Sequence, residues 1–139
     1  MLAIYPISNG YKIMAILHLV AVIAAFGPLF LYAPLRRAGE IQTIAKLHMR
    51  LAFPALVLVW VLGMGLTGMS DDAFKVSQTW IVLAILAWVV LAAVSWFLIR
   101  PALTDTSQTA IARLSAGVGV THLLLVVTLY LMVFKPGWP

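Results

Sequence analysis

The stretch from Thr79 to Ile99 reads TWIVLAILAWVVLAAVSWFLI and carries no charged side chain. An α-helix of roughly 20 apolar residues is long enough to cross the hydrocarbon core of a bilayer. Three further apolar runs have a similar length, and every backbone polar group inside lipid must be hydrogen-bonded within its own segment. Each run is therefore predicted to be a membrane-spanning helix. The predicted spans are Ile13 to Leu35, Leu51 to Met69, Thr79 to Ile99 and Leu114 to Phe134.

The composition of the whole chain supports this class. Hydrophobic residues make up 64% of the 139 residues and charged residues 9%, against roughly 45–50% and about 25% in soluble domains. A soluble core of this size cannot hide so much apolar surface, so lipid must be part of the solvent. We expect one all-α integral membrane domain over residues 1–139. The chain has no cysteine, which excludes a disulfide framework and a thiolate metal site.

The basic residues are distributed unequally among the connections. The first and third connections hold most of them, namely Arg36, Arg37, Lys46, Arg50, Arg100 and Arg113. The second connection, 70–78, has two aspartates and only Lys75. Because cytoplasmic loops are enriched in Lys and Arg, both termini are predicted to lie outside the cell. Short connections further predict antiparallel neighbours in an up-down four-helix bundle. Membrane orientation accounts for the net charge of +5 without a nucleic-acid partner.

The first connection contains a further element. Between Glu40 and Arg50, apolar residues recur at helical spacing: Ile41, Ile44 and Leu47. This pattern predicts a short amphipathic helix on the inner membrane surface. His48 is then expected to contact solvent or headgroups, and Tyr32 to belong to an interfacial aromatic belt.

Several residues inside the spans are predicted to shape helix packing. Pro28, which follows Gly27, should kink the first span because it removes a helical hydrogen bond. Two stretches of small residues should let helices approach closely: Gly63, Gly65 and Gly68, then Ser115, Gly117 and Gly119. The indoles of Trp60 and Trp88 lie near mid-membrane and need a hydrogen-bond partner or a protein neighbour.

No Asp, Glu, Lys or Arg lies in the core of a predicted span, which leaves His18 and His122 as the candidates for chemistry. Counted along ideal helices, His18 lies about 9 Å below the outer end of its span and His122 roughly 20 Å below. This difference in depth disfavours one haem held between both. A five-coordinate haem on His18 remains, with Met14 on the same face as a candidate second ligand. For His122 a hydrogen bond to a neighbouring helix is favoured over ligation or proton handling.

Motifs of other classes are missing. The carboxylates lie in loops, so a pump with a carboxylate relay is not indicated. There is no HExxH motif, no Walker loop and no Ser-His-Asp cluster in the sequence pattern. We therefore predict no catalytic residue, and the pattern favours a protein that is not an enzyme.

Three segments together resemble a known family: KIMAILH from Lys12 to His18, KLHMRLAFP from Lys46 to Pro54, and LYLMVFKP from Leu129 to Pro136. They resemble a bacterial family of integral membrane proteins of unknown function (domain of unknown function 2269). More distantly, they are similar to the HemJ-type protoporphyrinogen oxidases and to the CopD membrane domain. The resemblance implies a multi-pass protein of the bacterial cytoplasmic (inner) membrane.

The HemJ-type resemblance also implies a haem b site, because a histidine in the first helix of those enzymes, in a Leu-His context, is thought to bind haem. Leu17-His18 matches that context. Those enzymes also use a lysine in the third helix, where this chain has Ile81, Val82 and Leu83. This departure argues against protoporphyrinogen oxidation and leaves porphyrin binding open. Copper handling of the CopD type would need a richer set of methionines and histidines.

Two functions therefore compete. The favoured one is a non-catalytic accessory or assembly subunit packed against other membrane subunits, such as those of a respiratory complex, or against further copies of itself. The alternative is a b-type haem or quinone protein that uses His18, Met14 and His122, with His18 as the ligand of the haem iron. A small-solute transporter has the least support, because four helices are few and no span core is charged.

Overall fold

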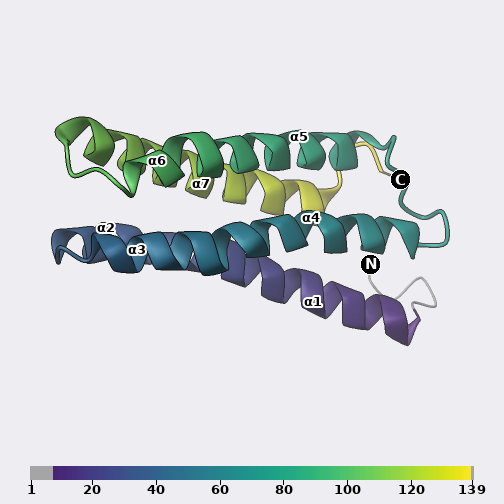
Figure 1. The fold of residues 1–139 in the computed structure, drawn as a ribbon. Coiled ribbons are helices and arrows are strands. Elements are labelled where there is room, and N and C mark those ends of the chain that lie inside the picture. Colours follow the sequence, from purple (N-terminus) through teal and green to yellow (C-terminus); the bar gives the residue numbers. More distant parts are fainter. Residues whose placement is uncertain (1–7, 139) are drawn as a thin grey trace.

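The computed structural model describes residues 8–138, and all regular structure within that range is helical. Four helices are long and apolar enough to cross a membrane: Asn9–Arg37, Ile41–Gly68, Thr79–Ala102 and Gln108–Phe134. They run back and forth along one axis, and the start of the first helix lies at the same end of the bundle as the end of the fourth (Figure 1). The predicted membrane class is confirmed at this level.

Short 3₁₀ and π segments divide the first three long helices. In chain order the elements are α1 (Asn9–Phe26), the 3₁₀ segment η1 (Gly27–Leu31), α2 (Tyr32–Arg37), α3 (Ile41–Leu47), the π segment η2 (His48–Ala52), α4 (Phe53–Gly68), α5 (Thr79–Ala93), the π segment η3 (Val94–Ile99), α6 (Arg100–Ala102) and α7 (Gln108–Phe134).

At Pro28, where a kink is predicted, the structure shows a 3₁₀ interruption of the first long helix. The α-helical pattern stops at Phe26, and η1 places Pro28 near its start before α2 begins at Tyr32. Proline has no N–H to donate, so the tighter 3₁₀ turn replaces regular α-helix at this point.

The short helix predicted between Glu40 and Arg50 is present as α3, but it is not a separate surface helix. The segment α3 continues through η2 into α4, so residues 41–68 form one long helix. The apolar stripe led by Ile44, which is 0% exposed, packs against Tyr32, Ile99 and neighbouring residues of this chain. The same periodicity that suits a lipid surface therefore serves here to bury a helix face against protein.

Most helix ends lie beyond the predicted spans because charge ends an apolar run without ending a helix. The fourth helix begins at Gln108 instead of Leu114, since the hydroxyl of Ser107 caps it by accepting from the N–H of Ala110. Two boundaries agree with the prediction: α5 begins at Thr79, and α7 ends at Phe134, where Lys135 adopts a left-handed conformation.

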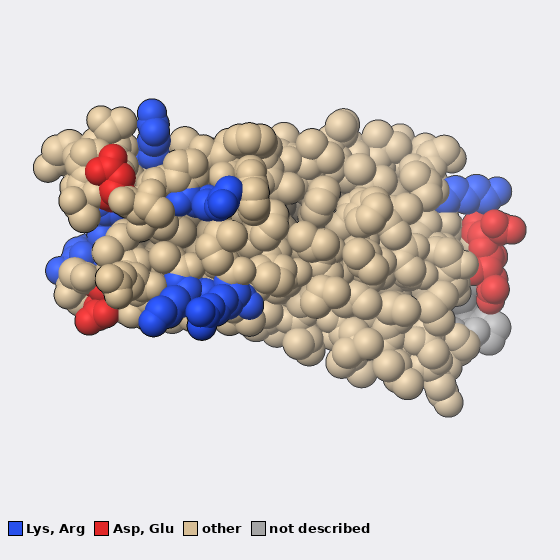
Figure 2. Space-filling view, in the orientation of Figure 1, with Lys and Arg blue, Asp and Glu red and all other residues tan. Residues whose placement is uncertain are grey.

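The surface of the bundle is apolar along its length and charged at its ends. Large side chains such as Ile23, Phe97 and Val133 are at least 70% exposed, as expected when lipid is the solvent. Lys and Arg gather around the end that carries α3 and α6, whereas both acidic and basic side chains are visible at the opposite end (Figure 2).

Interhelical packing agrees with two of the sequence predictions. A Cβ added to Gly117 in α7 would lie only 2.6 Å from Cγ1 of Ile99, so the glycine permits close approach of the third and fourth long helices. The indole N–H of Trp88 in α5 donates to the carbonyl oxygen of Leu56 in α4 at 2.8 Å. Gly119, in contrast, meets no atom within 4 Å of an added Cβ.

Candidate functional site

The two residues predicted to bind haem iron, His18 and Met14, lie on the face of α1 that packs against α4. A Cβ added to Gly63 would lie 3.2 Å from Cε1 of His18, and one added to Gly65 would lie 3.5 Å from Sδ of Met14. Both side chains therefore fill the space left by the glycines of α4. Nδ1 of His18 is buried and has no hydrogen-bond partner.

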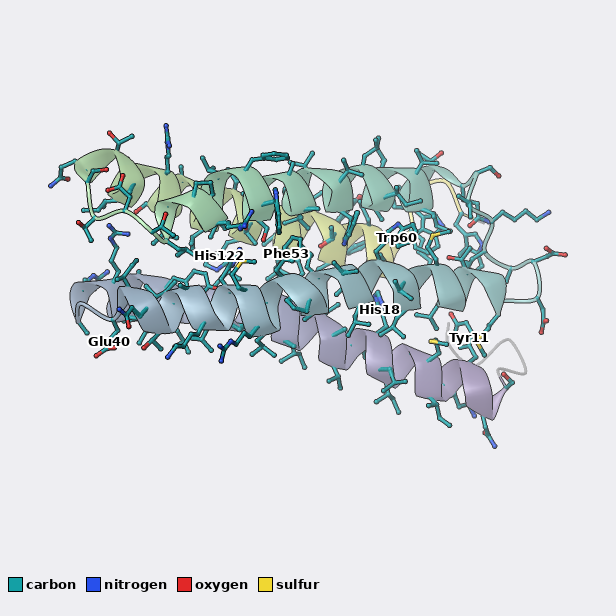
Figure 3. The ribbon with its side chains drawn as sticks, in the orientation of Figure 1. Tyr11, His18, Glu40, Phe53, Trp60 and His122 are labelled. Atoms are coloured by element: carbon teal, nitrogen blue, oxygen red, sulfur yellow. The ribbon has the colours of Figure 1, made fainter. Side chains whose placement is uncertain are left out.

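His122 lies elsewhere in the bundle. Its ring stacks on Phe30, with ring centroids 4.1 Å apart and an interplanar angle of 18°, and its Nε2 is buried without a hydrogen-bond partner. The contact is a stacked ring rather than the expected hydrogen bond at that nitrogen. Phe30 follows His18 by 12 positions along the first helix, which corresponds to about 18 Å of rise. The two histidines accordingly lie at different positions along the bundle (Figure 3).

The described residues offer no haem-sized cavity at these positions. Ligand pockets generally have volumes of several hundred Å³. The best-formed cavity among the described residues measures about 10 Å³, and it is lined by neither His18, Met14 nor His122. The three predicted ligands do not converge on one pocket within the described residues, so no haem step is derived from them. The cofactor prediction rests on the unpartnered nitrogen of His18 alone.

The structure instead assembles a polar cluster that the sequence did not predict, formed by Tyr32, His48 and Ser95. The hydroxyl of Tyr32 lies 3.1 Å from Nδ1 of His48, and Nε2 of His48 lies 2.9 Å from Oγ and 3.2 Å from the carbonyl oxygen of Ser95. Tyr32 is 0%, His48 1% and Ser95 5% exposed. The expectations that His48 contacts headgroups and that Tyr32 joins an interfacial belt are both wrong.

Each member of the polar cluster comes from a different long helix, near an irregular turn. Tyr32 begins α2 directly after the 3₁₀ segment, His48 begins the π segment η2, and Ser95 lies in the π segment η3. In η3 the N–H of Arg100 bonds to the carbonyl oxygen of Ser95, five residues back. A π turn is wider than an α turn and changes the direction of the side chains near it. Here the two π segments orient His48 and Ser95 toward each other.

The contacts of the polar cluster favour one tautomer of His48. A carbonyl oxygen only accepts, so the 3.2 Å contact between Nε2 of His48 and the carbonyl oxygen of Ser95 is a hydrogen bond only when Nε2 carries the proton. Nδ1 is then the acceptor for the hydroxyl of Tyr32. In this tautomer His48 cannot take the hydroxyl proton of Ser95, which a nucleophilic serine requires. The polar cluster is suited to holding three helices together rather than to acyl transfer.

The small cavity adjoins this cluster. It has a volume of about 10 Å³ and is lined by polar residues from three helices, His48, Ser95 and Thr121, and by apolar residues that include Phe26 and Leu91. A volume of this order suits at most one water molecule. It leaves no room for an organic substrate.

One sequence signal could have revealed the polar cluster. Ile44, His48 and Ala52 are spaced four residues apart and are 0%, 1% and 2% exposed. Residues at this spacing share a helix face. The continuity of that face was hidden because Lys46 and Arg50 suggested that the span begins at Leu51.

Metal binding by clustered side chains is not indicated. Among residues 8–138, no group of three or more His, Asp or Glu side chains is placed to hold a metal ion. In comparisons with known proteins, no family model, no curated protein and no solved structure matches this chain.

Proposed function

We propose that this protein is a non-catalytic accessory subunit that packs through its fourth helix against other subunits of a larger membrane complex, such as a respiratory complex. It lies in the bacterial cytoplasmic membrane, with the basic connections facing the cytoplasm and both termini outside. The positive-inside distribution supports this orientation.

The observation that carries the proposal is an unpartnered packing face on α7. Gly117 and Gly119 are two positions apart, so they point about 200° away from each other around the helix. Gly117 faces inward, where Ile99 fills the space above it. Gly119 faces outward into open space, and the exposed residues one and two turns before it on the same face are also small: Ala112, Ser115 and Ala116.

Small residues that face outward matter because lipid-embedded helices associate by close backbone approach. Lipid tails are as apolar as leucine, so helix pairs gain stability from packing over Gly, Ala and Ser instead of from a hydrophobic effect. The closed interior agrees with this function, since the cavity of about 10 Å³ cannot receive a substrate. The subunit therefore offers a surface rather than an active site.

Replacing Gly119 with leucine is expected to release the protein from its complex, because the larger side chain blocks close helix approach. Mild-detergent extracts of native membranes, separated by blue-native electrophoresis, should show the wild type in a species larger than its own 15.2 kDa. The Gly119→Leu variant should migrate alone. Gly68→Leu is the matched control: an added Cβ at Gly68 also meets no atom within 4 Å, but Gly68 lies on α4 and outside the packing face of α7.

Two results would contradict the accessory function. The first is a wild-type protein that already migrates as a monomer without partners. The second is a Gly119→Leu variant that migrates in the same assembly as the wild type. Co-purification of two differently tagged copies separates self-association from binding to other subunits.

The unpartnered Nδ1 of His18 favours a second candidate, a b-type haem or quinone site on α1. This function predicts a Soret band in protein purified after expression with adequate haem, shifted on addition of dithionite. His18→Ala should abolish the band and His122→Ala should leave it largely intact. Absence of a Soret band would exclude a haem site. Loss of the band in His122→Ala but not in His18→Ala would assign the haem to His122 instead of His18.

A further inference from the structure

A basic and aromatic surface crosses the second and third long helices at the end where Lys and Arg gather (Figure 2). The rings of Phe53 and Trp96 lie 5.1 Å apart, and the guanidinium carbon of Arg100 lies 4.0 Å above the ring of Trp96. Trp96 is 37% exposed, so the pair lies at the surface of the bundle. Its two members come from α4 and η3, which run in opposite directions (Figure 1).

The register of these helices brings a second arginine to the same level. Arg50 precedes Phe53 by three positions, about one helical turn, and Arg100 follows Trp96 by four. Because the helices are antiparallel, both displacements point toward the same end of the bundle. Lys46, one further turn along, is exposed on the same helix face as Arg50.

The carboxylates at this end are occupied elsewhere. The carboxylate of Glu40 accepts a hydrogen bond from Thr43 at 3.1 Å. Asp105 accepts from the backbone and hydroxyl of Ser107. Those bonds, and to a lesser degree the charge of Arg113, lower the pKa of Asp105. Among the described residues the hydrogen-bond partners of these carboxylates are neutral groups, and neither carboxylate is paired with Arg50 or Arg100, so the charge of the two arginines is available to a ligand outside the chain.

We propose that Arg50, Arg100, Phe53 and Trp96 form a binding site for an anionic phospholipid of the leaflet around the basic end. The two guanidinium groups bind the headgroup phosphate, for which their planar fork of N–H donors is suited. The aromatic pair and the exposed apolar residues beside it, Leu51 and Phe97, contact the glycerol backbone and the start of the acyl chains. Anionic lipid, with both a phosphate and an apolar tail, matches this combination better than a soluble anion. This site is independent of the packing face on α7.

The test is native mass spectrometry of the purified protein, titrated with phosphatidylglycerol or phosphatidylcholine. Wild type should retain phosphatidylglycerol preferentially. The double variant R50Q/R100Q should weaken its retention by roughly ten- to thirtyfold. The matched control K12Q/K75Q removes the same charge from exposed lysines at the opposite end and should change nothing.

Further variants separate a built site from general electrostatic attraction. Trp96→Leu keeps every charge and should still weaken phosphatidylglycerol binding, because the ring orients Arg100 and contacts the lipid. R50K/R100K keeps the positive charge but removes the planar set of guanidinium N–H donors, so it should bind phosphatidylglycerol with intermediate affinity. Circular dichroism verifies that each variant is folded.

Three outcomes overturn the proposal: equal retention of both lipids by wild type, equal weakening in K12Q/K75Q and R50Q/R100Q, or unchanged binding in Trp96→Leu. Inorganic phosphate at the same concentration is the competitor. If it displaces the lipid completely, the site recognises free phosphate and not a phospholipid.

Discussion

Replacing His48 with alanine is expected to lower the free energy of unfolding by about 2 to 4 kcal/mol, the largest effect of any single substitution proposed for this protein. His48 is 1% exposed and bonds to both Tyr32 and Ser95. The alanine variant would leave a cavity between three helices and two polar groups without their partner. The two losses add to each other, because the cavity removes packing contacts and the two hydroxyl groups lose a hydrogen-bond partner.

The measurement is equilibrium unfolding of purified protein in bicelles. His122→Ala is the matched control: that ring is only half-buried and stacks on Phe30 without a hydrogen bond at Nε2. Tyr32→Phe removes a single hydroxyl and should cost about 1 kcal/mol, since interhelical hydrogen bonds in membranes are individually weak. A His48→Ala variant no less stable than His122→Ala would contradict a stabilising function for the polar cluster.

Replacing Gly117 with valine is expected to destabilise the isolated protein by about 1 to 3 kcal/mol. A Cβ at this position would lie 2.6 Å from Cγ1 of Ile99, a side chain that is 0% exposed and branched at Cβ. Ile99 lines the interior cavity, but a volume of about 10 Å³ is too small to accept the displaced side chain, so α7 must move away from η3. The change should appear as a lower unfolding midpoint in the same bicelle assay.

Gly119→Val provides the control for this prediction, because an added Cβ there meets no atom within 4 Å. Its effect on the isolated protein should stay within about 0.5 kcal/mol. The two glycines then separate two properties of one helix: Gly117 determines stability of the subunit, and Gly119 determines its association. Equal destabilisation by both valines would mean that α7 packs in a different rotation.

The depths of His18 and His122 in the bundle could be predicted from the sequence, but their contacts could not. Rise per residue places His18 and His122 at different depths without any knowledge of packing, and the structure places them at different positions along the bundle. The same calculation could not identify what each ring contacts. His18 lies against Gly63 of the second helix, and His122 lies against Phe30 of the first.

The apolar, membrane-length character of the four long helices and their approximate positions follow from the residues of each segment. Apolarity over about 20 residues is a property of each segment alone, and lipid permits only a helix for such a segment. The kink region at Pro28 follows for the same reason, because a missing N–H is a local defect.

Only the tertiary structure decided which polar residues are brought together. His48 was assigned to the membrane surface because Lys46 and Arg50 flank it, yet it faces inward while Arg50 remains exposed. Its partners Tyr32 and Ser95 are 16 and 47 positions away in the chain. A charged neighbour fixes the depth of a residue in the membrane, but the rotation of a helix about its axis is set by the helices packed against it.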